Sequence, residues 1–594
     1  MSKGKKQGAL SVFRTVFPIV FHSAPGTYIA LEIVSFLHAL AFVGLPIFFQ
    51  RLFSVAEHLV NGSATISNVI FAISLLALVN IFWQVINATE NFIPIVYEEK
   101  TKGKLARDMQ DKIARLSPLD FEDTGKLDDI NKAEQGKNNA VDYVIRFSWI
   151  FSFYIPYFGL MGWYFATLKP ILAVLILLIF TPSFLAYIAR IQIFSKLEDK
   201  SAPLRRESEY YQACIVDREY FKETRLLGAY GYFEKLRQEN IRLINDLSFK
   251  ANLKSKLYEA GLKIITVLGY VGILLLLFYS VLDRSISVGA FASILATITY
   301  LFFLMDELAS QIVGDLTKNW GTINNYINFL NLNERGGVEQ KTDFSNGIEA
   351  RNVSFTYPAK TTPALKNISF SIKPGETVAI VGENGSGKST LIKLLTGIYL
   401  PSQGEVYFGG TNTGTITKSS LFANMSAIFQ KFQQYKMTLE ENIGISATGQ
   451  RQDGGSLDGV CQLSGFSPGD PVFSNGYETV LSREFGGVDL SGGAWQRIAI
   501  ARGLYRTHEM IVLDEPTAAI DPIEETRVYH QFAQISQGKI AVIVTHRLGS
   551  VRLADRIFVL KQGELVESGT HEELLNYGGE YARLYKSQEQ WYMR

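Results

Sequence analysis

The sequence predicts a polytopic α-helical membrane domain followed by a soluble α/β domain that contains a phosphate-binding loop. Residues 1–310 hold long apolar runs, and apolar residues make up 47% of the chain. Farther on, a buried-strand pattern at Val378–Val381 leads into a glycine-rich loop and a helical pattern at Leu391–Leu395. The length of 594 residues is too great for one domain and predicts about two to four.

The glycine-rich loop, Gly382–Ser389, fits the pattern G-x-x-x-x-G-K-[ST]. Glycines let the backbone N–H groups turn toward phosphate oxygens, and the following helix N-terminus favours an anion. Lys388 can reach the β- and γ-phosphates, and the Ser389 hydroxyl can ligate Mg²⁺. A turn that binds nothing is the alternative, but the position between strand and helix favours a nucleoside triphosphate site. The residues expected around the nucleotide are Gly382, Glu383, Asn384, Gly385, Ser386, Gly387, Lys388, Ser389 and Thr390.

Six apolar segments have the length needed to cross a bilayer. Buried helices of a large soluble protein are the alternative, but six such runs with few charges argue against it. Ahead of them, Val12–Phe21 is amphipathic and is expected along the membrane surface. The six segments are Tyr28–Phe53, Ile66–Ile86, Val144–Thr167, Ile171–Ile191, Leu262–Leu282 and Ala290–Leu308.

Charge in the connections predicts the orientation. Lys and Arg crowd the N-terminus and the long connections 87–143 and 192–260, whereas 54–65, 168–170 and 283–289 are short and nearly free of them. The positive-inside rule therefore places both chain termini and both long connections in the cytoplasm. No cleavable signal peptide is expected, because no compact apolar core and cleavage site follow the basic start.

Other compositional features exclude whole classes of function. The net charge of +1 gives no field for binding nucleic acid. The two cysteines, Cys214 and Cys461, lie in segments expected in the cytosol, so neither a disulfide framework nor a cysteine-based metal site is expected.

Two turns in the cytoplasmic connections mix apolar and charged residues. They lie at 116–123 and 217–228. Solvated loops are the alternative, but the mixture favours surfaces that dock onto the α/β domain. Inside the membrane segments, Glu32 either faces a cavity or reaches back to the interface. The third segment is aromatic, and an interface belt is favoured over a substrate-facing wall for Tyr154, Tyr157, Phe158, Trp163 and Tyr164.

The expected domains are the membrane domain at 1–332, a polar linker at 333–347 and the α/β domain at 348–594. Within the last, Tyr357 is placed to stack on adenine, and the amide of Gln430, at a strand end, could ligate Mg²⁺ or orient water. The loop of Ser491, Gly492 and Gly493 opens a helix and offers a second anion site. Each of these residues alone could be merely structural.

A second predicted apolar strand, Met510–Leu513, is followed directly by two carboxylates. Asp514 suits Mg²⁺ coordination and Glu515 suits activation of water. The strand before His546 places that histidine at a strand's carboxyl end, where ligands of α/β domains bind.

This ordered set resembles the nucleotide-binding domain of the ATP-binding cassette (ABC) superfamily. Gly382–Ser389 resembles Walker A, and Met510–Asp514 resembles Walker B, with Glu515 as its general base. The remaining matches are Tyr357 to the adenine-stacking aromatic, Gln430 to the Q-loop, Leu490–Gly493 to the signature, Ala518–Asp521 to the D-loop and His546 to the switch histidine. Six membrane segments before one such domain resemble the exporter half-transporters, so the resemblance covers nearly the whole chain.

The resemblance implies ATP and Mg²⁺ as cofactors, a helical subdomain in the α/β domain, and coupling helices at 116–123 and 217–228. It also implies that two half-transporters pair, because each ATP lies between one subunit's Walker A and the other's signature. A homodimer is the default and a heterodimer remains open. The expected function is ATP-driven export from the bacterial cytoplasm by alternating access; the cargo, whether peptide, hydrophobic drug or lipid, stays open.

The sequence departs from the family pattern in three places: Ala494 in the signature, Ala519-Ile520 in the D-loop, and Glu484–Leu490, which lacks the usual exporter glutamate. Two local sequences, Phe485–Gly487 and Phe432–Tyr435, resemble those of Gram-positive lantibiotic exporters. No early cysteine points to a leader-cleaving peptidase domain. A soluble ABC ATPase acting on ribosomes or DNA is disfavoured by the apolar segments, whereas a lipid flippase or an ATP-gated channel or regulatory protein shares the layout.

Overall fold

The computed structural model describes residues 9–308, 320–358, 360–448, 456–515, 532–533, 536–545 and 550–592. Contacts divide the chain into two compact units. The helical unit comprises residues 1–111 and 129–331, and the α/β unit comprises 112–128 and 332–594. The short segment 112–128 therefore folds with the α/β unit, although more than two hundred residues separate it from the rest of that unit in the sequence.

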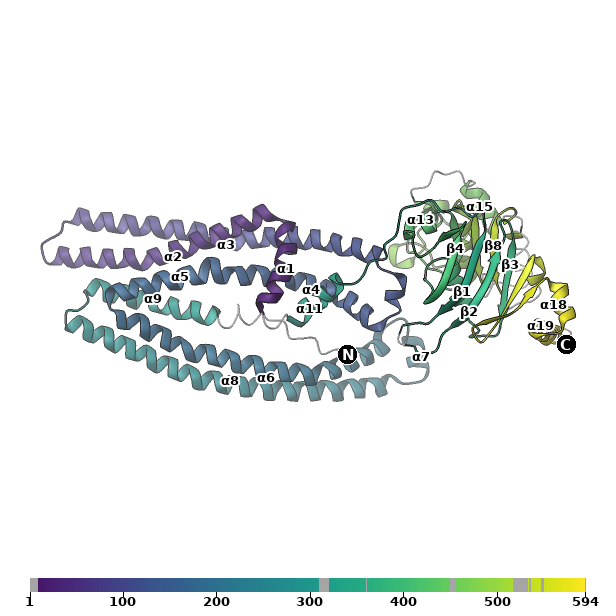
Figure 1. The fold of residues 1–594 in the computed structure, drawn as a ribbon. Helices are drawn as coiled ribbons and strands as arrows, with labels where there is room; N and C mark the ends of the chain where they lie inside the picture. The colour runs from purple at the N-terminus through teal and green to yellow at the C-terminus, as the bar shows by residue number, and fades with distance from the viewer. Residues whose placement is uncertain are drawn as a thin grey trace. The chain divides into compact units, whose positions relative to one another are not determined.

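Long helices make up the helical unit, and α6 and α8 lie side by side (Figure 1). Proline opens both α2 and α6, where its missing N–H costs no hydrogen bond. The helices are α1 (Ala9–Ser23), α2 (Pro25–Val60), α3 (Ile66–Arg115), α4 (Thr124–Trp149), α5 (Ile155–Leu168), α6 (Pro170–Val216), α7 (Phe221–Leu226), α8 (Tyr230–Leu282), α9 (Val288–Glu307) and α11 (Trp320–Leu330).

Within the described residues, five helical stretches are long and apolar enough to cross a membrane. The six-span prediction is thus supported for five segments; the fourth, 171–191, lies in α6 but is not one of the five. The most apolar windows of α3 and α8 are only 6% and 17% buried. Such exposed apolar surface is unfavourable in water and suits lipid, so the exposure supports a membrane location. The five stretches are Pro25–Val60, Ile66–Arg115, Thr124–Leu168, Tyr230–Leu282 and Val288–Glu307.

Helix α1 is amphipathic, as expected. Val12, Val16 and Val20 recur every four residues and are fully buried. The aromatic-belt prediction for the third segment is wrong for three of its tyrosines. Tyr154, Tyr157 and Tyr164 are buried inside the unit, whereas Trp163 is 66% exposed.

The α/β unit contains two sheets (Figure 1). The six-stranded sheet has the order β10-β9-β3-β8-β7-β6, and β3, β8, β7 and β6 run parallel. The carboxyl ends of these four strands consequently lie at one edge of the sheet, where ligands of α/β domains bind. The strands are β3 (Thr377–Gly382), β6 (Met425–Ile428), β7 (Met510–Asp514), β8 (Ile540–Val544), β9 (Arg556–Lys561) and β10 (Glu564–Gly569).

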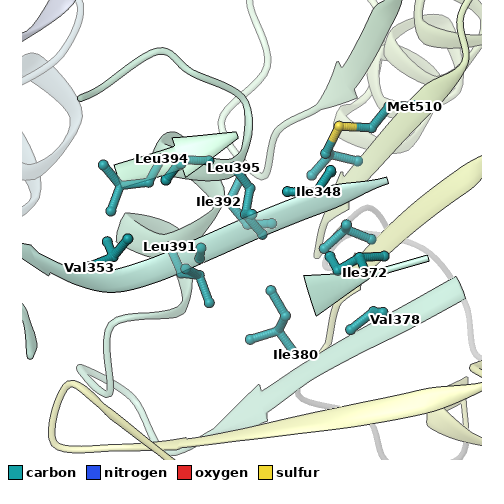
Figure 2. Close-up of a cluster of buried hydrophobic side chains, with 14 of the residues drawn as sticks. Ile348, Val353, Ile372, Val378, Ile380, Leu391, Ile392, Leu394, Leu395 and Met510 are labelled. Carbon is teal, nitrogen blue, oxygen red and sulfur yellow. The ribbon is translucent and has the colours of Figure 1, made fainter. Parts of the chain in front are cut away.

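The second sheet is antiparallel, with the order β2-β1-β4-β5. Figure 2 shows apolar side chains of both sheets meeting those of α12 (Lys388–Leu395), among them Ile348, Ile380 and Leu391. This main cluster fixes α12, and with it the loop that precedes the helix. The strands are β1 (Ile348–Phe355), β2 (Leu365–Ile372), β4 (Gln403–Phe408) and β5 (Thr411–Asn412).

A separate apolar cluster holds a helical subdomain together. Trp495, Ile498 and Leu439 are among its buried members. Its helices are α14 (Leu439–Gly444), α15 (Leu457–Leu463) and α16 (Gly492–Tyr505). The remaining helices of the unit are α13 (Lys418–Phe422), α18 (His571–Tyr577) and α19 (Glu580–Tyr592).

Candidate functional site

The loop between β3 and α12 requires glycine at two positions. Gly387 has φ +105°, and a Cβ there would lie 2.6 Å from Leu365 Cδ2. A Cβ at Gly382 would lie 2.3 Å from the carbonyl oxygen of Leu560. Since a side chain at either position would force the backbone apart, the tight curl of the loop depends on these glycines.

Lys388 folds back over this loop. Its Nζ donates to the carbonyl oxygens of Gly382 (2.9 Å) and Glu383 (3.0 Å), and the residue is only 5% exposed. Burial lowers the pKa of the Lys388 ammonium, and the charges of Glu515 and Asp514 oppose that effect. The loop carbonyls therefore hold the ammonium in place, and two carboxylates act as its counter-charges.

One polar group in the loop has no protein partner. The Ser386 hydroxyl is buried and makes no hydrogen bond. A buried orphan of this kind is uncommon and points to a ligand or water. Glu383, Asn384, Gly385 and Ser389 are exposed along the same loop and face the space outside it.

Tyr357 lies beside the start of α12. Its hydroxyl and the Thr390 hydroxyl are 3.0 Å apart, and its ring packs edge-on against Phe355 and Tyr399. The structure therefore brings Tyr357 to the phosphate loop, as its expected role in stacking on adenine requires.

Two carboxylates and an amide meet at the carboxyl edge of the sheet. Asp514 ends β7 and is 7% exposed; burial, followed by the charge of Glu515, raises its pKa to about 6. Gln430 Nε2 donates to Glu515 Oε2 at 2.6 Å. Glu515 has φ +47°, and its N–H donates to the carbonyl of Val544 at 3.0 Å. A non-glycine residue in this region costs about 1–3 kcal/mol, and such strain concentrates at functional sites.

The oxygen donors at this edge suit Mg²⁺. Ser389, Gln430 and Asp514 offer a hydroxyl, an amide and a carboxylate from three different elements. Mg²⁺ commonly takes only one or two protein ligands and completes its shell with phosphate and water. Within the described ranges there is no group of three His, Cys, Asp or Glu that could hold a metal ion.

The loop that opens α16 belongs to the helical subdomain. Ser491 caps the helix by accepting from the N–H of Ala494 at 3.3 Å, and Ser491 and Gly492 are exposed. Gly493 follows in the first turn. A Cβ at Gly492 would meet nothing within 4 Å, so this surface is open. His546 and the stretch 518–521 lie outside the described residues.

Segment 116–123 docks onto the α/β unit, as expected. It forms a 3-10 turn, Pro118–Phe121, in which Ser117 and Asp120 cap each other. Leu119 packs against the main cluster, and Lys418 Nζ donates to the carbonyl oxygen of Leu116 at 2.6 Å. The other segment, 217–228, belongs to the helical unit; Leu226 and Leu227 are 87% and 70% exposed, and its docking remains a prediction.

Tyr399 joins this docked segment to the nucleotide loop and is a residue that the sequence analysis missed. Its hydroxyl donates to Glu122 at 2.5 Å, and Lys393 Nζ lies 3.3 Å from the same carboxylate. The tyrosine hydrogen bond, and then Lys393, lowers the pKa of Glu122. The edge-on contact between Tyr399 and Tyr357 continues the connection. An isolated aromatic in a loop gives no sequence signal for such a contact.

We expect Tyr399→Phe to loosen the docked segment. The change removes only the hydroxyl that donates to Glu122, a loss worth about 1 kcal/mol, so hydrogen exchange of 116–123 should rise about fivefold at pH 7. The docked Glu122 has a lowered pKa, so its contribution is present above the usual value of 4.5 and disappears as the pH falls through the lowered one. Tyr407→Phe is the matched control, because Tyr407 donates to Glu405 at the same distance, 2.5 Å, elsewhere on the unit. Equal exchange in both variants would contradict the contact's role.

The sequence of this chain is similar to those of known transport proteins. Residues 365–518 match the family model described as ABC transporter. The subtilin transport ATP-binding protein SpaT of Bacillus subtilis is 29% identical over 551 residues, which cover 90% of this chain and 88% of SpaT. The nisin transport ATP-binding protein NisT of Lactococcus lactis is 34% identical over 247 residues, only 41% of this chain and 40% of NisT.

Two further proteins resemble this chain, one in sequence and one in fold. The ATP-dependent lipid A-core flippase of Escherichia coli K12 is 36% identical over 241 residues, 41% of each protein. The solved structure of a bacterial Atm1-family ABC exporter with ATP bound aligns with a TM-score of 0.74 at 21% identity, covering 95% of this chain and 98% of the exporter chain. At that identity the likeness establishes the fold.

Proposed function

Because this chain belongs to the ABC transporter superfamily as an exporter-type half-transporter, in which ATP hydrolysis is coupled to transport, we propose that it exports a peptide, a hydrophobic drug or a lipid-like substrate from the bacterial cytoplasm. The observation that carries the proposal is one constellation. Lys388, Gln430, Asp514 and Glu515 meet at the carboxyl edge of a parallel sheet, in a chain whose described residues include five candidate membrane spans.

Each residue of the site takes a distinct role. The backbone of 382–390 and the Lys388 ammonium bind the β- and γ-phosphates, and Tyr357 stacks on the adenine. Glu515 accepts the proton of the attacking water, and its hydrogen bond to Gln430 fixes the carboxylate in position. Ser389, Gln430 and Asp514 would hold Mg²⁺, which when bound neutralises phosphate charge. His546, which follows β8 in the sequence, would contact the γ-phosphate.

The site is half of a larger one. Ser491, Gly492 and Gly493 present an exposed helix N-terminus, suited to the γ-phosphate of a nucleotide held by a second subunit. We take that subunit to be a second copy of this chain, since both residues predicted to be catalytic, Glu515 and His546, are present in the sequence; a heterodimer is the alternative.

In this proposal, ATP binding and hydrolysis drive the movements of the membrane domain. The membrane domain, 1–332, has six spanning helices, and a linker at 333–347 leads to the nucleotide-binding domain, 348–594, with both termini cytoplasmic. Two bound ATP molecules close the paired nucleotide-binding domains. The docked segment 116–123 transmits that closure to the helices that flank it, the membrane halves open outward, and hydrolysis resets them.

Membrane vesicles of defined orientation test export and orientation together. Inside-out vesicles containing the protein should accumulate cargo when ATP is added outside, and right-side-out vesicles should not. The probes are a labelled amphipathic peptide, a fluorescent hydrophobic dye and a fluorescent short-chain phospholipid. Vesicles with Glu515→Gln are the inactive control. A channel would instead equilibrate the probe without accumulation, and a flippase would move only the lipid. ATP-independent equilibration of every probe would overturn the exporter assignment.

A further inference from the structure

The carboxyl-terminal helix α19 packs against β3, the strand that leads into the phosphate loop. Tyr581, in the first turn of α19, is fully buried and shares an apolar cluster with Ala379 and Val381 of β3. The carboxylate of Glu567, on β10, accepts from the backbone N–H groups of Glu580 and Tyr581 at 2.5 and 3.0 Å. A carboxylate at a helix N-terminus is favourable. Burial and this charged cap therefore fix the position of α19 relative to β3.

One side chain of α19 reaches the phosphate loop itself. Arg583 Nη2 donates to Glu383 Oε1 at 2.5 Å, and the same guanidinium donates to both carboxylate oxygens of Glu580 at 2.5 and 3.2 Å. Lys561 Nζ donates to Glu580 at 3.0 Å. The hydrogen bond from Arg583 is the main cause that lowers the pKa of Glu580 to about 2, so Glu580 is ionised at pH 7. The two carboxylates and the two cations of this cluster consequently cancel in charge.

Glu383 carries the only negative charge in the loop sequence 382–389. Its carbonyl oxygen lies 3.0 Å from Lys388 Nζ, the group expected to reach the β- and γ-phosphates. Like charges repel, so an uncompensated carboxylate at this position would weaken the binding of a triphosphate. The ion pair itself contributes little to folding, because the side chains of Arg583 and Glu383 are 54% and 59% exposed. Its main effect is therefore on the electrostatic potential at the phosphate loop.

We infer that α19 is part of the nucleotide site and that Arg583 strengthens ATP binding by cancelling the charge of Glu383. Arg583 is thus a positioning residue, which acts on the nucleotide through the loop carboxylate that it holds. It lies 200 residues beyond Glu383 in the sequence. The inference rests on the proposed function, because it takes the backbone of 382–390 to be the phosphate site.

The first test removes the compensating charge. Arg583→Gln should weaken nucleotide binding about fivefold, whereas Arg583→Lys, which keeps the charge, should stay within about twofold of the wild type. Binding of radiolabelled adenylyl imidodiphosphate, a non-hydrolysable ATP analogue, to the full-length protein in nanodiscs is measured by equilibrium dialysis with Mg²⁺. Arg351→Gln is the matched control, because Arg351 is 55% exposed and pairs with Glu349 at 2.7 Å on the antiparallel sheet. Equal affinity of Arg583→Gln and the wild type would overturn the inference.

A double variant separates the cancellation of charge from a structural role. Adding Glu383→Gln to Arg583→Gln returns the net charge of the cluster to zero, so affinity should recover to within about twofold of the wild type. A double variant that binds as weakly as Arg583→Gln would mean that Arg583 only supports the fold, and the inference would fail while the proposed function stands. Absence of analogue binding by the wild type would instead count against the proposed function.

Discussion

Changing Glu515→Gln should nearly stop ATP hydrolysis while ATP still binds. An amide cannot accept the proton of the attacking water, and loss of a general base costs about 10²–10⁴-fold in rate. In the wild type, Gln430 Nε2 donates to the Glu515 carboxylate at 2.6 Å. The side-chain amide oxygen of the variant can accept the same hydrogen bond. Phosphate release measured under single-turnover conditions, beside a filter assay for bound nucleotide, separates the two effects.

A control variant tests whether the loss of a carboxylate charge alone lowers the hydrolysis rate. Glu564→Gln removes a carboxylate from the exposed strand β10, where Glu564 lies 3.9 Å from Lys366. Its hydrolysis rate should stay within about twofold of the wild type, since an exposed ion pair contributes little. Near-normal turnover by the Glu515→Gln variant would mean that another group is the base.

Mixed dimers should test whether each nucleotide is shared between two subunits. One chain carries Lys388→Ala, and a differently tagged chain carries Gly492→Asp, both in the Glu515→Gln background. In either homodimer both sites are damaged, since every site takes one half from each identical subunit. In the mixed dimer both lesions fall into one site, and the other site combines an intact Lys388 with an intact Ser491–Gly493 loop.

The expected result is occlusion of about one ATP per mixed dimer and almost none by either homodimer. An aspartate at 492 sets a negative charge against the γ-phosphate at a helix N-terminus that favours anions. The backbone tolerates the change sterically, because a Cβ at Gly492 would meet nothing within 4 Å. Gly492→Asn, similar in size but neutral, is the matched variant and should retain much more ATP than Gly492→Asp.

Radiolabelled ATP retained after gel filtration of tandem-tagged dimers gives the stoichiometry. If all three species retained the same amount of ATP, each site would be complete within one chain. The shared-site mechanism, and the closure of paired nucleotide-binding domains that depends on it, would then be wrong.

Local patterns predicted most of the α/β fold. The apolar runs that precede Gly382 and Asp514 are β3 and β7 of one parallel sheet, with β8 between them. They could be predicted because fully buried strands read as continuous apolar stretches. The chemistry of Lys388, Asp514 and Glu515 was readable for the same reason, since each follows a strand end or a glycine-rich turn. The aromatic third segment was misread because composition gives the number of tyrosines but not the face of the helix on which they lie.

The sequence by itself determined the phosphate loop, the order of the motifs and the apolar segments, because each of these depends on residues close together in the chain. Only the tertiary structure decided which distant residues meet: Tyr399 with Glu122, Gln430 with Glu515, and Trp83 with His38 and Glu90. These contacts join residues 45 to 277 positions apart. A hydrogen bond depends on the position of two atoms to within a fraction of an ångström, and that position follows from the packing of whole helices and sheets, which no local pattern encodes.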